Sequence, residues 1–229
     1  MSTWTDFYRD FELLPAESSE HIARSQRLRY QVYCTEHGFL NPDDYPDQRE
    51  VDQFEDRAVH TLLRHRQSGE IIATVRMVLA DAADPNRHFP IERGEVLRHL
   101  LQDYGWAIPR ESIGEISRLA VVKEFRLPGV IVGLFKAILA MTARKNVTHW
   151  YAVMEPSLLR LLRQSGIKFT PVGPLVDYHG LRQPCVAVAE EVLANVRQHR
   201  PAIWDFVTDS GATVLPHKHA KSIQLTTDH

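Results

Sequence analysis

Cysteine is scarce in this sequence, with two residues in 229, and Cys34 and Cys185 lie far apart in the chain. Cysteines that form no C-x-x-C spacing are typical of a protein from a reducing compartment. No stretch approaches the roughly 18 consecutive apolar residues that a membrane-spanning helix needs. The first 14 residues are polar and acidic and have no apolar signal segment. We therefore expect a cytoplasmic protein without an integral membrane segment.

An excess of charge of one sign is also missing, since 27 basic and 29 acidic residues give a formal net charge of -2. This balance disfavours a nucleic-acid-binding protein, which would usually be basic. Neither G-x-G-x-x-G nor G-x-x-x-x-G-K-[S/T] follows an expected strand, which disfavours a dinucleotide site and a P-loop. The 12 histidines include no H-E-x-x-H, and H-K-H at 217–219 lies in a polar tail. We expect no metal site.

The sequence does contain a succession of apolar and amphipathic segments typical of one α/β domain. Helices are expected at about 19–37, 127–145, 156–166 and 190–206. Strands are expected at about 7–14, 58–66, 70–80, 113–122, 149–154, 168–172, 175–179 and 184–189. This order predicts a mixed central sheet that is antiparallel in its first half. The domain should span residues 1–208, with an insertion at 81–112 that ends in a short helix, and a polar tail at 209–229.

Charged and polar side chains interrupt these elements at several places. The segment 50–56 is acidic, and Arg76 lies inside a hairpin strand. The strand at 113–122 contains Glu115, Ser117 and Arg118, and the first long helix carries Arg29 and Glu36. Each alone has an ordinary interpretation, such as a solvated loop, an edge-strand arginine or a structural ion pair. Glu115 and Ser117 should share one face of their strand, with Arg118 on the other unless a bulge intervenes.

Together, the spacings of these residues resemble those of the acyl-homoserine-lactone synthases. The matching elements are R-x-x-V-[F/Y], E-x-D-x-x-[D/E], a mid-strand arginine and E-x-S-R, at Arg29, Val32, Tyr33, Glu50, Asp52, Glu55, Arg76, Glu115, Ser117 and Arg118. Residues 153–184 are more similar to the N-acyl amino acid synthases. They are most similar to the acyltransferase-like proteins associated with bacterial exosortase (PEP-CTERM) systems.

The resemblance implies a GNAT-like α/β fold, whose mixed, V-shaped central sheet is flanked by helices and splays to admit a pantetheine arm. It implies transfer of a fatty acyl group from acyl carrier protein or acyl-CoA to the amine of an amino acid or a derivative. The donor substrate would be an acyl-phosphopantetheine, and no bound cofactor is implied. A lactone synthase that uses S-adenosylmethionine and a non-catalytic module that binds an acyl carrier or a lipid remain alternatives.

Amide formation from a thioester needs a neutral amine, a polarised carbonyl and an aligned donor. An α-amine titrates near pH ~8, so a nearby carboxylate could accept its proton. The acidic segment, Glu50, Asp52 and Glu55, offers such carboxylates. By resemblance, Glu115 would position or deprotonate the amine and Arg118 would order the acidic segment. The implied catalytic residues are Glu50, Asp52, Glu115 and Arg118, and the implied substrate-binding residues are Arg29, Glu55, Arg76 and Ser117.

The loop after the strand at 113–122 would hold the donor. GNAT acetyltransferases carry [Q/R]-x-x-G-x-[G/A] there, at a helix N-terminus whose amides bind the CoA pyrophosphate. This chain keeps Arg126 and Gly129 but has Ile131 as the last residue, which is consistent with the single phosphate of a carrier protein. Carrier proteins are acidic and should meet a basic surface, for which Lys136 is a further candidate. The implied donor-binding residues are Val121, Lys123, Arg126 and Gly129.

Two further features have open interpretations. The apolar helices at 127–145 and 156–166 are either core or the wall of an acyl slot, in which each buried CH₂ would contribute roughly 0.8 kcal/mol. Cys34 and His37 could form a nucleophile and base, but the end of a helix does not stabilise a thiolate. We therefore expect transfer by direct attack, without an acyl-enzyme.

Overall fold

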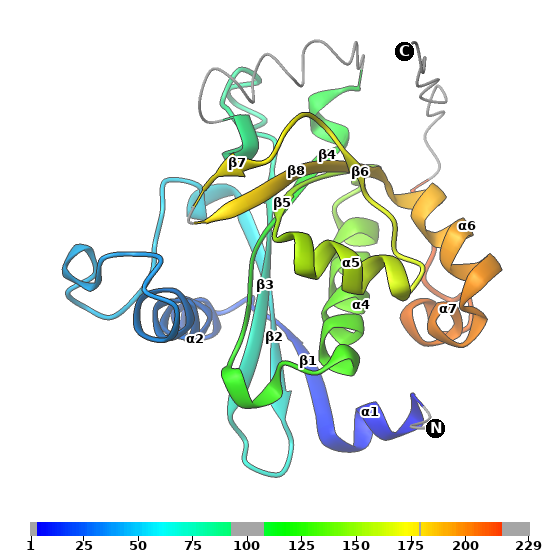
Figure 1. Ribbon diagram of the computed structural model, residues 1–229, viewed down its shortest axis with the longest axis horizontal. Coiled ribbons are helices and arrows are strands. Elements are labelled where there is room, and N and C mark those ends of the chain that lie inside the picture. Colours follow the sequence, from blue (N-terminus) through cyan, green and yellow to red (C-terminus); the bar gives the residue numbers. More distant parts are fainter. Residues whose placement is uncertain (1–3, 93–107, 179, 217–229) are drawn as a thin grey trace.

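The computed structural model describes residues 4–92, 108–178 and 180–216. Its centre is an eight-stranded sheet in the order β1-β2-β3-β4-β5-β8-β6, with β7 paired to β8 (Figure 1). The strands are β1 (Phe11–Pro15), β2 (Ala58–His65), β3 (Ile71–Leu79), β4 (Ile113–Val121), β5 (His149–Met154), β6 (Thr170–Pro171), β7 (Val176–Asp177) and β8 (Leu181–Val188). The helices are α1 (Thr5–Asp10), α2 (Ser19–Tyr30), α4 (Pro128–Arg144), α5 (Pro156–Gln164), α6 (Ala189–His199) and α7 (Pro201–Thr208).

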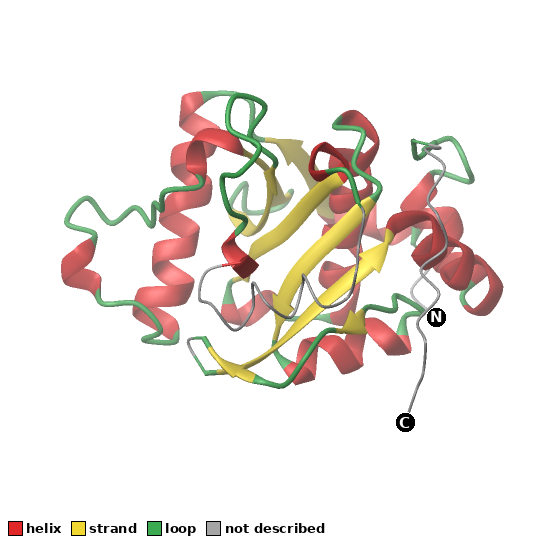
Figure 2. Ribbon diagram, turned by 90° about the horizontal axis from the view of Figure 1, so that it is seen from above, coloured by secondary structure: helices red, strands yellow, loops and turns green. Residues whose placement is uncertain are grey.

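The sheet is antiparallel from β1 to β4, as the order of elements predicted. The next pair, β4 with β5, is parallel, and β5 with β8 is antiparallel again. Helix α2 covers one face of β2 and β3 and α4 covers the other, so that helices lie on both sides of the sheet (Figures 1 and 2). This burial on both faces explains why β3 is apolar along nearly its whole length.

The two parallel strands separate after a short paired stretch. Their pairing runs only from Ile113 with His149 to Ile116 with Ala152. Beyond it β4 continues to Val121 and β5 to Met154, and no pair joins them. One side of β4 therefore presents an unpaired edge, and the sheet has the V-shaped opening that the resemblance implied.

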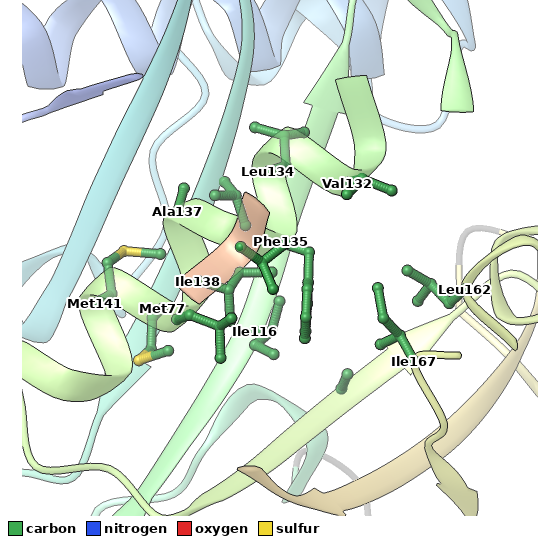
Figure 3. Close-up of a cluster of buried hydrophobic side chains, with 14 of the residues drawn as sticks. Met77, Ile116, Val132, Leu134, Phe135, Ala137, Ile138, Met141, Leu162 and Ile167 are labelled. Atoms are coloured by element: carbon green, nitrogen blue, oxygen red, sulfur yellow. The ribbon is translucent and has the colours of Figure 1, made fainter. Parts of the chain in front are cut away.

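Helix α4 forms the core on the side of this opening. Its apolar residues pack against Met77 of β3 and Ile116 of β4, and the cluster extends to Leu162 of α5 (Figure 3). Trp150 of β5 is completely buried and donates from Nε1 to Thr142 Oγ1 of α4 at 2.9 Å. The long apolar run of α4 is thus explained by a helix that is buried along most of its surface.

Two of the expected elements differ from those observed. The strand expected at 7–14 begins only at Phe11, because Thr5–Asp10 form a helix that packs Phe7 against Phe206 with ring centroids 5.0 Å apart. The helix expected at 190–206 is two helices, since Pro201 has no N–H to continue the first one. The short helix expected in the insertion and the histidines at 217–219 lie outside the described residues.

Helix α7 ends at Thr208, where the polar tail was expected to begin, and the division into one domain and a tail stays a prediction. Of the helices that the structure describes, none is long and apolar enough to cross a membrane.

The contact between α1 and α4 gives a test of the fold. A Cβ on Gly133 would lie 2.4 Å from two carbons of the Phe7 ring, whereas a Cβ on Gly129 would meet nothing within 4 Å. We expect Gly133→Ala to lower the free energy of unfolding by about 1–3 kcal/mol, because the overpacked ring must move. The control Gly129→Ala, in the first turn of the same helix, should be neutral or slightly stabilising. Urea unfolding measures both, and equal values for the two variants would contradict this packing.

Candidate active site

A β-bulge in β4 sets the geometry of the site. Arg76 of β3 is paired with Ser117, but Thr74 is paired with Ala120, so β4 has one extra residue between these pairs. Arg118 lies in this bulge with φ of 51°, a left-handed conformation that costs free energy for a residue other than glycine. Arg76 Nε donates to Ser117 Oγ at 3.1 Å, and both arginines bind Asp52. The bulge thus brings Arg118 to the same acidic segment as Arg76.

Glu50 is held between two arginines in the interior. Its carboxylate is completely buried and accepts from Arg29 Nε at 2.6 Å and from Arg118 Nε and Nη2 at 3.1 and 3.0 Å. Arg29 also donates to the backbone oxygen of Glu50. Burial alone would raise the pKa of Glu50, but the charges of Arg118 and Arg29 lower it below its ordinary value.

Asp52 and Glu55 complete the network around Arg76. The Arg76 guanidinium binds both oxygens of Asp52, at 2.7 and 2.9 Å, and Glu55 Oε1 at 2.8 Å. Glu55 also accepts from Arg29 at 2.7 Å and lies 3.3 Å from His60 Nε2. Burial would raise the pKa of both carboxyls, but the hydrogen bonds from Arg76 to Asp52 and from His60 to Glu55 lower it. Three guanidinium groups thus balance three carboxylates.

This arginine–carboxylate network is a poor proton acceptor. Its carboxylates are already bound by guanidinium groups, and their pKa values are lowered. The network favours a framework role for Glu50 and Asp52 over the catalytic roles that the resemblance implied, and those roles stay predictions. Five of its six members also lie outside the walls of the cleft described next: Arg29, Glu50, Asp52, Glu55 and Arg76.

A cleft of about 610 Å³ lies where β4 and β5 separate. One wall is β4 from Glu115 to Val121, and the other is the end of β5 from Ala152 to Met154. Its apolar side comes from α4 and α5, through Ile131, Phe135, Ile138, Leu158, Leu161 and Leu162. These two helices therefore contribute both to the core and to the apolar wall of the cleft, and Phe135, Ile138 and Leu162 belong to both. That this wall holds an acyl chain stays a prediction.

Glu115 differs from the acidic residues of the network. It is 2% exposed, lines the cleft, and accepts from the backbone N–H of Ile91 at 2.8 Å. Burial raises its pKa from the ordinary 4.5 to about 8. Ser117 lines the same wall, as expected for residues two apart on a strand. A carboxyl whose pKa is close to that of an α-amine, ~8, is matched to accept the amine's proton.

Val32 and Tyr33, from the R-x-x-V-[F/Y] element, also line the cleft. They lie in a π-helical turn, Gln31–Glu36, that continues α2. The Tyr33 hydroxyl donates to the Leu119 carbonyl at 3.0 Å, and its ring lies 5.8 Å from the Arg118 guanidinium. Tyr33 thus joins the end of α2 to the bulged strand. Cys34 in the same turn is buried, which raises the pKa of its thiol and disfavours a nucleophilic role.

The residues expected to bind the donor lie at one end of the cleft. Val121 and Arg126 line it, Lys123 is exposed on a 3₁₀ turn, and Gly129 is in the first turn of α4. Arg126 is engaged, because it donates to the Val121 carbonyl at 3.0 Å and to the Glu36 carboxylate.

Lys136, expected to be part of a basic docking surface, is buried instead. It donates to the Phe206 carbonyl at 2.8 Å and pairs with Asp209 at 2.7 Å. The helical pattern alone did not show that α7 covers this position. Lys136 therefore holds α7 against α4, and its ammonium group does not face a carrier protein.

Apart from His37, which was considered as a base for Cys34, the residues that close the other end of the cleft were not expected from the sequence. These come from the segment after α2 and from the β7–β8 hairpin, and they are His37, Phe39, Leu40, Tyr178 and Arg182. The R-Y-Q-V-Y-C-T-E-H-G-F and H-G-L-R-Q-P stretches contain most of them, so the resemblance of these stretches was the only available signal.

Comparisons with known proteins agree with this geometry. Residues 28–136 match the family model of the acetyltransferase (GNAT) domain. The structure of TofI, in a ternary complex with an inhibitor and MTA, has 25% identity, covers 85% of this chain and 99% of its own, and superposes with a TM-score of 0.63. The CoA-dependent acyl-homoserine lactone synthase BjaI, with SAM and isopentyl-CoA, has 20% identity, coverages of 82% and 88%, and a TM-score of 0.62.

A third similar structure is FeeM, an N-acyl amino acid synthase from uncultured soil microbes. It has 14% identity, coverages of 81% of this chain and 94% of FeeM, and a TM-score of 0.58. A search of curated protein sequences gave no significant match.

The match of residues 28–136 to the GNAT domain model and the open mixed sheet confirm the GNAT-like fold and the acyltransferase class that the motifs predicted. Its structural relatives include acyl-homoserine lactone synthases and an N-acyl amino acid synthase, the two groups that the motifs resemble. The association with exosortase systems is not among these findings and stays a prediction.

The buried network predicts a large effect of one neutral substitution. We expect Glu50→Gln to lower the free energy of unfolding by about 3–5 kcal/mol, because it leaves Arg29 and Arg118 buried beside a neutral amide. In the control Glu17→Gln the change should be about 1 kcal/mol or less, since Glu17 pairs with Arg144 on the surface at 74% and 42% exposure. Chemical denaturation measures both values, and a Glu50→Gln effect as small as the control would contradict the network.

The raised pKa of Glu115 predicts that the free energy of unfolding depends on pH. Folding raises its pKa from the ordinary 4.5 to about 8. Between these pH values the folded protein therefore keeps a proton that the unfolded chain has released. Stability should therefore fall as the pH rises through this window, by an amount on the order of a few kcal/mol. Glu115→Gln should remove that slope, because the amide does not titrate. Unfolding curves of both proteins from about pH 5 to about pH 9 provide the measurement, and parallel profiles would disprove the raised pKa.

Proposed function

We propose that the protein transfers a fatty acyl group from an acyl-phosphopantetheine thioester to the amine of an amino acid or of an amino-acid derivative. The observation that carries this proposal is one cleft that joins an apolar slot to a buried carboxyl, Glu115, with a pKa of about 8. The slot suits a fatty acyl chain, and the carboxyl suits the proton of an amine.

The proposed reaction is direct. The pantetheine arm lies along the unpaired edge of β4 beyond Ile116, where a peptide-like chain can bind as a strand does. Glu115 takes the proton of the acceptor's ammonium group, directly or through water, and the neutral nitrogen attacks the thioester carbonyl. The C–N bond forms, the C–S bond breaks, and the second proton leaves with the thiol. Ser117 and Arg118 share the wall with Glu115, where they orient the reactants.

We further propose acyl carrier protein as the donor and the cytoplasm as the place of reaction. Ile131 departs from the pattern that binds a CoA pyrophosphate, and it lines the cleft one turn into α4. Lys123 is exposed beside the start of that helix and offers a positive charge to an acidic carrier. Since BjaI is a CoA-dependent enzyme of the same fold, acyl-CoA is the alternative donor.

Acyl-homoserine-lactone synthesis is the second candidate function. It is favoured by the likeness to TofI, whose complex contains MTA, at 25% identity over nearly all of that chain. The two functions differ in their co-product, because a lactone synthase consumes S-adenosylmethionine and a simple N-acyltransferase does not.

Product analysis tests the proposal. The purified protein is given lauroyl donors on carrier protein and on CoA, with the 20 amino acids and S-adenosylmethionine, and products are identified by mass spectrometry. We expect N-lauroyl amino acids, faster formation from the carrier protein, and a rate for Glu115→Gln that is about 10²–10⁴-fold lower because proton transfer is lost. The control Glu111→Gln, at an exposed position near the start of β4, should keep the wild-type rate.

The other outcomes are equally informative. A lauroyl lactone formed together with methylthioadenosine would establish the second candidate function. Products formed at the wild-type rate by Glu115→Gln would overturn the role of Glu115 as the base. The absence of any acylated product in all mixtures would contradict N-acyl transfer to amino acids.

A further inference from the structure

Three arginines contribute to the walls of the cleft, and two of them are committed to partners inside the protein. Arg118 is bound by two buried or nearly buried carboxylates, as described above. Arg126 is bound by the Val121 carbonyl and by Glu36, whose side chain is 16% exposed. Both guanidinium groups are therefore neutralised by residues that are fixed in the fold, and neither is well placed to exchange its partner.

The third arginine, Arg182, differs in the kind of partner it has. Its Nη2 lies 3.0 Å from Glu155 Oε1, and the Glu155 side chain is 45% exposed while that of Arg182 is 14% exposed. Its Nη1 donates to the neighbouring Leu181 carbonyl, at 3.2 Å. Because the Glu155 side chain reaches the solvent, water can hydrate its carboxylate when it leaves Arg182, so a competing anion can take its place.

Arg182 is held at the end of the cleft away from the donor residues. Arg182 is the second residue of β8, and this start of the strand pairs with β7 in a short hairpin. Its guanidinium lies 5.2 Å from the centre of the Phe39 ring, so the hairpin meets the segment that follows α2. The ring and the hairpin orient the guanidinium and partly shield it from water, which strengthens its interaction with an anion.

We propose that Arg182 binds the carboxylate of the acceptor amino acid, taking it in exchange for Glu155. This inference rests on the proposed function and specifies its acceptor as an amine that carries a carboxylate, rather than a simple amine or a polyamine. The planar guanidinium fits a carboxylate through two parallel hydrogen bonds. The donor, which enters beside Gly129 and Val121, leaves this end of the cleft to the acceptor. Glu155 keeps the site neutral until the acceptor arrives.

Binding of product-like ligands tests this inference without turnover. N-octanoylglycine and N-octanoylglycinamide have the same chain and differ only in the charge of the head group. Calorimetry with the wild type should show about tenfold or tighter binding of the carboxylate, as expected for a charge-assisted pair. Arg182→Gln should bind both ligands alike, and Arg182→Lys should keep part of the preference. Glu155→Gln should bind the carboxylate more tightly than the wild type does, because the competing anion is gone.

Kinetics of the acylation reaction supply a second readout. Arg182→Gln should raise the KM for the acceptor about tenfold and leave the KM for the acyl donor unchanged. A change in the donor KM instead would mean that Arg182 binds the donor's phosphate, and it would overturn the proposal. Equal binding of the two octanoyl ligands by the wild type, or a preference that persists in Arg182→Gln, would overturn it too while leaving N-acyl transfer intact. Failure of the wild type to bind either ligand would overturn the proposed function as well.

Discussion

The interior ion pairs of Glu50 with Arg29 and Arg118 are the constraint on which the rest of the site depends. Each of these groups would be costly to bury alone, so the acidic segment, the end of α2 and the bulge of β4 must come together for any of them to be accommodated. The same pairing compensates for the left-handed backbone of Arg118. The network therefore acts as a fixed frame, and the separation of β4 from β5 is built beside it.

The frame divides the carboxyl groups near the cleft into two kinds. Glu50, Asp52 and Glu55 are surrounded by guanidinium groups, which hold their pKa values low and keep them charged. Glu115 lies only a few residues from Arg118 in sequence, yet it is buried without such a partner among the contacts described, and its pKa is raised to about 8. The two environments suit different roles. Charged carboxylates that are already bound by guanidinium groups stabilise the structure, whereas a carboxyl whose pKa is close to that of an amine can exchange a proton with the amine.

The sequence predicted much of this arrangement, because periodicity and chemistry agree in the long elements. The antiparallel first half of the sheet and the α4 and α5 helices follow from apolar patterns and the order of elements. The gathering of Glu50, Asp52 and Arg118 was implied by the resemblance of their motifs to those of the acyl-homoserine-lactone synthases. The position of the bulge could not be predicted from the sequence, because one extra residue in a strand gives no distinct hydrophobic pattern. Helix α1 was missed because Phe7 packs into the space beside Gly133, a contact between segments far apart in sequence. The burial of Lys136 and the position of Arg182 in the wall of the cleft were not predicted for the same reason, because α7 and the β7–β8 hairpin decide their surroundings.

This division also explains why the motifs indicated a reaction class and left the acceptor undefined. Half of the motif residues belong to the frame and lie outside the walls of the cleft, so they specify a bulged, splayed sheet and the carboxyl beside it. The walls that we propose to meet the acceptor come from the segment after α2 and from the hairpin that carries Arg182. Tyr178 interacts electrostatically with Arg118, but among the described residues the charged partners of the network come from other elements, so most of these walls can change without disturbing the buried charges. One frame can therefore support acyl transfer to different amines, and the head group is selected by side chains that the frame does not constrain.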